Sequence, residues 1–184
     1  MSRKYHFGDE DHLHFVTFTV IEWIDAFIRD EYRQVVVNSI KFCQQNKGLE
    51  VYGYVIMPSH VHMIIGRNKE ANLEEIVRDM KSFTSSTIRK MINNSKEVGE
   101  SRKEWMMKML QDAGRRNSNN RDFQFWQQHN RPIELWTLDV FNQKLEYIHN
   151  NPVQAGFVDE PDSWLYSSAR NYSKKRSYIE ILYP

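Results

Sequence analysis

The sequence predicts an α+β protein with a ferredoxin-like (RRM-like) antiparallel sheet, helices on one face of it, and an additional C-terminal helix and tail. Two observations support this class. The periodicities of the apolar residues follow the order strand, helix, strand, strand, helix, strand, which is the split βαβ arrangement. The 184 residues, 40% hydrophobic and 13% aromatic, suffice for a proper core. We therefore expect one domain over residues 1–184.

The first strand and the first helix lie near the N-terminus. Residues 12–20 are rich in aromatic and β-branched types, which favours a buried strand. Residues 30–46 have apolar side chains at intervals of three and four, as an amphipathic helix does. Asp30 is expected to cap this helix at its N-terminus.

A β-hairpin and a second helix follow. Residues 50–57 and 61–66 are predicted strands, joined by a tight turn at Met57-Pro58-Ser59. Residues 72–93 are a predicted helix, capped by its first residue, asparagine, and with one apolar stripe.

The fourth strand and the last helix are expected in the second half of the chain. The polar residues 94–121 are predicted to form an insertion or mobile loop, helical in part. Residues 123–128 are rich in aromatic side chains, which favours a strand, and we expect them to form the fourth strand of the sheet. Asp139 is expected to cap a helix that Pro152 ends, and residues 153–184 are expected to form the C-terminal tail.

Composition limits the possible function classes only loosely. The formal net charge of +1 is low for a protein that coats DNA without specificity. No apolar run approaches the roughly 20 residues of a membrane span, and the N-terminus lacks the apolar segment of a signal peptide. The lone Cys43 excludes an internal disulfide and fits a reducing compartment. We expect a cytoplasmic protein.

Two histidines stand two residues apart in the hairpin. Because side chains alternate along a strand, His60 and His62 project to the same side, at a spacing that suits a shared metal ion. The ferredoxin-like layout places the first strand beside this one, which would set His12 or His14 next to the pair. The alternative is a chance pattern, since His12 and His14 have the same spacing.

Tyr147 and Asn151 are four residues apart near the end of the last predicted helix, so they lie on one face, a turn from each other. A phenol and an amide oxygen in this arrangement could serve as a nucleophile and a metal ligand. The alternative is an ordinary amphipathic position for Tyr147 and a C-cap role for Asn151 before Pro152.

Three stretches taken together resemble a known family. Tyr-Val-Ile-Met-Pro-Ser-His-Val-His-Met-Ile-Ile (residues 54–65) and Tyr-Ile-His-Asn-Asn-Pro-Val-Gln-Ala-Gly (residues 147–156) resemble the single-tyrosine HUH transposases. The REP-associated tyrosine transposases and their insertion-sequence relatives are the most similar group. Tyr-Ser-Ser-Ala-Arg-Asn-Tyr (residues 166–172) resembles the tail of that group, so the resemblance spans about residues 12–172.

The resemblance implies metal-dependent cleavage and rejoining of single-stranded DNA through a 5′-phosphotyrosine intermediate, in DNA transposition or a domesticated REP-type activity. It gives the nucleophilic role to Tyr147. It gives metal binding to His60 and His62, with Asn151 as the third ligand. Magnesium or manganese is the expected ion.

The resemblance also implies a partner. Single-stranded DNA that carries a hairpin is the expected substrate, met at the nucleoid, and a homodimer is one expected assembly. We expect the basic side chains near the C-terminus to hold DNA phosphates, with a solvated basic face as the alternative. These side chains are Arg170, Lys174, Lys175 and Arg176.

Two other functions are compatible with the same residues. One is a non-catalytic module that binds single-stranded nucleic acid on its sheet, which would not require Tyr147 and Asn151 near a histidine pair. The other is a small metallohydrolase that uses water as its nucleophile. It would react without a covalent adduct and would stay active in Tyr147→Phe.

Overall fold

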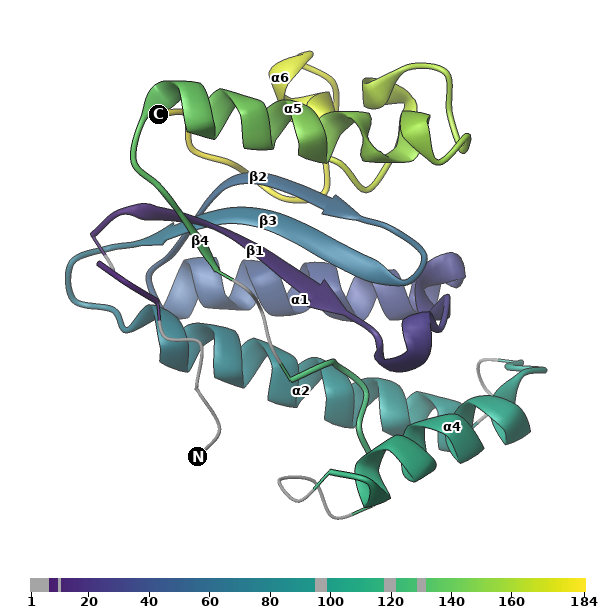
Figure 1. Cartoon of the computed structure of the whole chain (residues 1–184). Helices are drawn as coiled ribbons and strands as arrows, with labels where there is room; N and C mark the ends of the chain where they lie inside the picture. Colours follow the sequence, from purple (N-terminus) through teal and green to yellow (C-terminus); the bar gives the residue numbers. More distant parts are fainter. Residues whose placement is uncertain (1–6, 10, 95–98, 118–121, 129–131) are drawn as a thin grey trace.

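The computed structural model describes residues 7–9, 11–94, 99–117, 122–128 and 132–184. Figure 1 shows a four-stranded sheet between two helical layers. The strands are β1 (Leu13–Thr19), β2 (Leu49–Ile56), β3 (His60–Arg67) and β4 (Ile133–Leu135). The helices are α1 (Asp30–Asn46), α2 (Leu73–Asn93), α4 (Lys103–Arg115), α5 (Leu138–Gln154) and α6 (Ala169–Tyr172), with 3₁₀ turns η1 (Ile21–Trp23), η2 (Ala26–Ile28) and η3 (Pro161–Ser163).

The sheet has the strand order β2-β3-β1-β4, and each neighbouring pair is antiparallel. This order and the βαββαβ connectivity are those of the ferredoxin-like fold, which confirms the predicted fold class. Among the described helices, none is long and apolar enough to cross a membrane.

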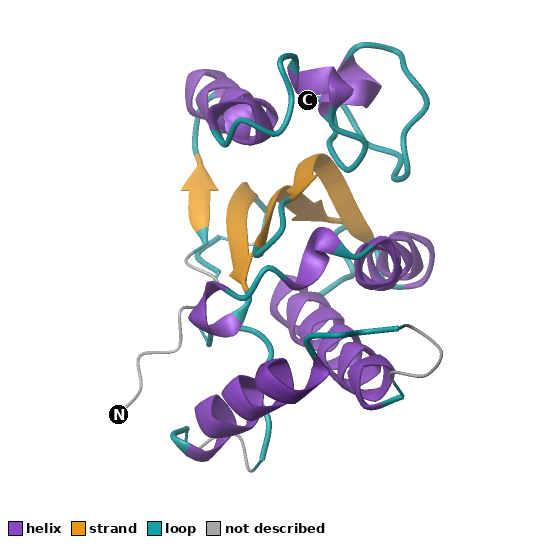
Figure 2. Ribbon diagram, turned by 90° about the vertical axis from the view of Figure 1, so that its right-hand side faces the viewer, coloured by secondary structure: helices purple, strands orange, loops and turns teal. Residues whose placement is uncertain are grey.

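The two faces of the sheet are covered by different helices. Val16 and Phe18 of β1 point into the larger core, which includes the apolar stripes of α1 and α2. Phe15, on the opposite face of β1, belongs to a smaller core with Leu145 and Ile148 of α5. Figure 2 shows the strands between these two groups of helices. The face that α5 covers is therefore the one that carries His62, because His62 is paired with Thr17 of β1.

The prediction of the fourth strand at residues 123–128 was wrong. The fourth strand is β4, which pairs with Leu13–Phe15 of β1. Residues 123–128 extend past the other end of β1, where Trp126 makes a single bridge to Val20. Their aromatic content reflects burial, because the Trp126 ring lies 5.5 Å from the Phe27 ring in the core.

Two predicted helix caps were also wrong. The N-cap of α1 is Arg29, and Asp30 is the first helical residue, whose carboxylate accepts a hydrogen bond from the Tyr166 hydroxyl. The cap of α5 is Thr137, whose side chain accepts a hydrogen bond from the Val140 N–H. Asn72 does cap α2 as predicted, by accepting a hydrogen bond from the backbone of residue 75 at 2.8 Å.

Helix α5 continues through Pro152 to Gln154, so the prediction that the proline ends the helix was wrong. Pro152 is buried in the last turn of the helix, and its ring removes the one hydrogen bond that an N–H at this position would make to the carbonyl of residue 148. Asn151 is consequently a helical residue and not a C-cap, since the helix is capped by Ala155.

The amphipathic piece within residues 94–121 forms α4, while residues 95–98 and 118–121 lie outside the described residues. Helix α4 is attached to the rest of the domain at both ends. At its start, the buried carboxylate of Glu100 pairs with Arg29 and Arg102. Near its end, the Leu110 carbonyl accepts a hydrogen bond from the Gln124 N–H at 2.9 Å.

The C-terminal tail lies along the outer edge of β2. Backbone hydrogen bonds join it to Val51, Tyr54 and Ile56. They run from Leu182 N to Val51 O (2.8 Å), from Ser168 N to Tyr54 O (2.9 Å) and from Ile56 N to Tyr166 O (2.9 Å). The tail thereby covers an edge that would otherwise present unpaired backbone groups.

Candidate active site

The histidine pair lies at the start of β3, on the face that α5 covers. The His60 and His62 ring centroids are 4.7 Å apart, so both imidazoles meet in one place. The strand register sets Thr19 opposite His60 and Thr17 opposite His62. The expectation that His12 or His14 neighbours the pair was therefore wrong, because His14 is opposite Ile65 near the far end of β3.

The ring of His62 is fixed on both sides. Its Nδ1 forms a hydrogen bond of 2.8 Å with Thr17 Oγ1, and Phe15 stacks on it with centroids 5.3 Å apart. The Nε2 atom consequently faces α5, where it lies 3.5 Å from the Tyr147 hydroxyl. A partner on Nδ1 that leaves Nε2 free is the usual way in which a protein orients a metal-binding histidine.

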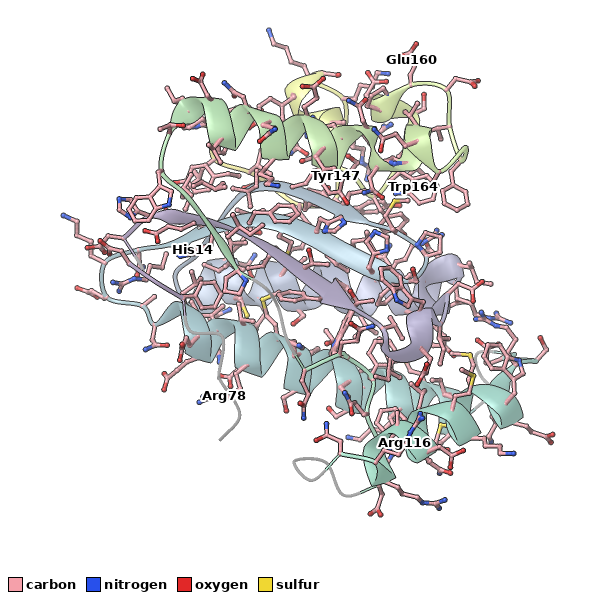
Figure 3. All side chains as sticks on the ribbon, viewed as in Figure 1. His14, Arg78, Arg116, Tyr147, Glu160 and Trp164 are labelled. Carbon is pink, nitrogen blue, oxygen red and sulfur yellow. The ribbon has the colours of Figure 1, made fainter. Side chains whose placement is uncertain are left out.

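Helix α5 presents Tyr147 and Asn151 toward the histidines. Tyr147 is 42% exposed and lies on the side of the helix that faces the sheet (Figure 3). The Asn151 side chain is hydrogen-bonded to the His60 ring. Gly53 of β2 lets the helix approach, because a Cβ atom there would lie 2.8 Å from Leu145 Cδ1. The structure thus brings together the four residues that the sequence suggested for chemistry.

Burial favours the neutral form of both imidazoles. It lowers the pKa of His62 to about 3, and the charges of His60 and Lys144 act in the same direction. Burial also lowers the pKa of His60, although the hydrogen bond with Asn151 acts the other way. A neutral imidazole has the free lone pair that a metal ion requires, so the pair needs no deprotonation step before it binds one.

The remaining sequence-predicted residues lie elsewhere. His149 points to another side of α5, where its Nε2 is 2.9 Å from Ser168 Oγ and burial lowers its pKa to about 4. In the basic cluster near α6, Arg170 donates to the carbonyl oxygens of Asp162 and Arg176, and Lys175 forms an ion pair with Asp162 at 2.8 Å. These two cations are thus held by other protein groups.

Three residues of the site were missed by sequence reasoning. Thr17 and Phe15 contact His62, and Lys144 lies 5.3 Å above the Phe15 ring. Lys144 could have been found, because it is three residues before Tyr147 on the same side of a helix. Thr17 and Phe15 could not, because their position depends on the register between two distant strands.

Replacement of Thr17 by valine is expected to weaken the binding of manganese about 10- to 100-fold, because the isosteric side chain cannot hold His62 Nδ1. Isothermal titration of Mn²⁺ into the two proteins measures the effect. The matched control is Thr19→Val, on the same face of β1 but opposite His60. An equal loss of affinity in both variants would contradict an orienting role for Thr17.

The fold and the site together define the single-tyrosine HUH class: a ferredoxin-like sheet, a histidine pair on one face, and a tyrosine that faces the pair from a C-terminal helix. The family model described as "Transposase IS200 like" matches residues 12–109, which is more than half of the chain. The chain belongs to this family. The matched range contains His60 and His62 and ends before α5.

One solved structure agrees with the fold, and a second is less similar. The structure of a REP-associated tyrosine transposase bound to a REP hairpin superposes with a TM-score of 0.65 at 15% identity, over 95% of this chain and 87% of that chain. A candidate transposase from Deinococcus radiodurans R1 reaches a TM-score of only 0.41 at 16% identity, over 82% of this chain and 95% of that one. A search of curated protein sequences finds no match.

Proposed function

We propose that this protein cleaves and rejoins single-stranded DNA through a covalent 5′-phosphotyrosine at Tyr147, with a divalent metal ion at the histidine pair. The main support is the distance of 3.5 Å between the Tyr147 hydroxyl and His62 Nε2, which puts a nucleophile beside a metal-binding group. Tyr147 comes from a helix outside the range of the family match, so this proximity is independent support for its role.

The donor set fits magnesium or manganese. His60 and His62 are neutral, and the amide of Asn151 completes a set of three in reach of one ion. Within the described residues there is no group of three or more His, Cys, Asp or Glu side chains that could hold a metal, so the amide is the natural third ligand here. When bound, the ion would polarise the scissile phosphate and offset the charge on its oxygens.

Each group of the protein has a defined task in the reaction. The Tyr147 oxygen attacks the phosphorus, a new P–O bond forms, and the bond to the 3′ oxygen breaks, which leaves a free 3′-hydroxyl. The phenol proton leaves to water, which reaches the half-exposed ring, and the 3′ oxygen takes a proton up. Lys144, one helical turn before Tyr147, adds positive charge beside the phosphate. Attack by a 3′-hydroxyl on the phosphotyrosine reverses these steps and rejoins DNA.

The substrate is single-stranded DNA that carries a hairpin. This part of the proposal is supported by membership of the transposase family and by the fold shared with a transposase that was solved with a REP hairpin. Arg170, Lys174, Lys175 and Arg176 are proposed to contact DNA phosphates. Lys174 and Arg176 are the better candidates for phosphate contacts, because Arg170 and Lys175 already contact Asp162.

The test is a denaturing gel that detects a covalent protein–DNA adduct. Labelled single strands from the DNA that flanks the gene are incubated with wild type and with Tyr147→Phe, in manganese, in magnesium and in EDTA. We expect an adduct that requires metal and is lost in Tyr147→Phe, because phenylalanine keeps the ring and removes only the nucleophile. Tight binding without an adduct on either strand would favour the binding module. Cleavage that persists in Tyr147→Phe would favour the metallohydrolase.

A further inference from the structure

We propose that the indole of Trp23 is a stacking platform for the DNA base next to the scissile phosphate, an inference that rests on the proposed strand cleavage. Three properties of this residue support it: its exposure, its contact with His60, and its backbone conformation.

The Trp23 side chain borders the proposed reaction site. It is 61% exposed, although an indole is among the largest apolar groups that a protein can bury. Its ring meets the His60 ring edge-on, with the centroids 5.7 Å apart and an interplanar angle of 75°. An edge contact of this kind leaves most of the indole surface open, directly beside a proposed metal ligand.

The backbone of Trp23 has a conformation that disfavours a bulky side chain. Its φ angle is 56° and that of Glu22 is 51°, both in the left-handed region where glycine is the favoured residue. A turn that served only to connect β1 to η2 would be more stable with glycine at these positions. Strained residues of this kind gather at functional sites, where the surroundings hold them in place.

The surroundings do hold this turn in place. Backbone hydrogen bonds join its two ends to the β2–β3 turn, which leads directly into His60, and to residues 123–128. These bonds run from Val20 N to Ser59 O, from Ile21 N to Phe125 O and from Phe27 N to Pro58 O, each 2.8 Å long. The backbone that carries the indole is therefore fixed relative to the turn that leads into His60.

Single-stranded DNA has the complementary chemistry. Every unpaired base offers a flat π-face, and stacking on an aromatic side chain strengthens binding about 5- to 150-fold per base. Stacking of the base beside the cleaved bond would also hold the phosphate in line with the Tyr147 hydroxyl, which faces the same histidine pair. The platform tolerates different bases, because it recognises the ring and not its hydrogen-bonding edge.

The test uses Trp23→Gly, which removes the indole and also relieves the backbone strain, so the variant is expected to fold. The matched control is Glu22→Gly, which relieves strain at the neighbouring residue and keeps the indole. Each change is made separately in the Tyr147→Phe variant, which is the parent protein of the experiment. Affinity for the flanking single strands is measured by fluorescence anisotropy. We expect Trp23→Gly to weaken binding about 5- to 150-fold and Glu22→Gly to leave it unchanged.

An abasic scan then identifies the stacked base. Single nucleotides of the oligonucleotide are replaced in turn by abasic sites. At one position next to the cleaved bond, an abasic site should weaken binding to the parent protein as much as Trp23→Gly weakens binding to the intact strand. The abasic strand and the Trp23→Gly protein together should show no further loss of affinity. Equal affinity of Trp23→Gly and its parent, or losses that add at every position, would overturn the platform.

The scan also separates this inference from the proposed function. It measures binding in proteins that lack the nucleophile, so it does not depend on cleavage. If the losses of affinity are non-additive at one nucleotide, but the protein that keeps Tyr147 forms no adduct, base stacking is supported and cleavage is overturned. If that protein forms an adduct, but no abasic position shows a non-additive loss of affinity, only the stacking role of Trp23 is overturned.

Discussion

His62→Ala is expected to abolish the metal-dependent adduct at Tyr147, with a larger loss than the roughly 10- to 100-fold attributable to a residue that only orients a ligand. The reason is geometric. The Nε2 atom of His62, a proposed metal ligand, lies 3.5 Å from the hydroxyl of Tyr147, the proposed nucleophile, and the Nδ1 atom of the same ring is already bonded to Thr17. Adduct yield and Mn²⁺ affinity, measured on the same preparation, check the prediction.

The chain supplies a matched control in His12→Ala. His12 and His14 have the same spacing as the site pair, but His12 lies near the start of β1 and its ring is bonded to Glu134 of β4. Loss of its imidazole is expected to leave both metal affinity and adduct yield unchanged. If His12→Ala reduced them as much as His62→Ala, the metal site would have to be placed at the other end of the sheet.

The parts of the site that follow from local periodicity could be predicted from the sequence. His60 and His62 share a face because strand side chains alternate, and Tyr147 and Asn151 share a face because a helix turns every 3.6 residues. Each half of the site is thus encoded within a few residues. That the two halves meet was suggested only by the family resemblance, because β3 and α5 are about eighty residues apart.

The rest depends on contacts between distant segments. The register of β1 on β3 decides that Thr17, and not His14, stands beside the histidines, and no periodicity within either strand determines it. The short β4 has only three residues, too few to show alternation, whereas residues 123–128 have strand-like composition for reasons of burial. Pro152 was misleading because a proline disfavours the helix but does not exclude it, and α5 runs two residues beyond this buried proline.

Glu100→Gln is expected to lower the free energy of unfolding by about 3 kcal/mol, which corresponds to about 6–12 °C in melting temperature. The Glu100 carboxylate is fully buried, with Oε2 2.9 Å from Arg102 Nη2 and 3.3 Å from Arg29 Nε. Glutamine keeps the shape but removes the charge, which leaves two arginines without their partner. The expected loss lies at the lower end for buried ion pairs, because both arginines are partly exposed and can be solvated.

The effect should depend on pH in a defined direction. Burial alone would raise the pKa of Glu100, but hydrogen bonds from Arg102 and the charge of Arg29 outweigh it and hold the pKa below its ordinary value. The unfolded chain therefore binds a proton at higher pH than the folded one, and the stabilisation is complete above the ordinary glutamate pKa of about 4.3. It is lost as the pH falls through the lower folded pKa, so the melting curves of wild type and Glu100→Gln should converge in acid.

Thermal unfolding across this pH range, with Glu22→Gln as the matched control, tests the prediction. Glu22 also contacts an arginine, Arg116, at 2.9 Å, but both side chains are largely exposed, so its loss should change stability by less than about 1 kcal/mol. Equal effects of the two changes would show that the Glu100 pair contributes no more than a surface contact.

Arg102 also donates to the Asp25 carbonyl at 3.0 Å, two residues beyond Trp23. The arginine that pairs with Glu100 therefore also contacts the chain segment that follows Trp23.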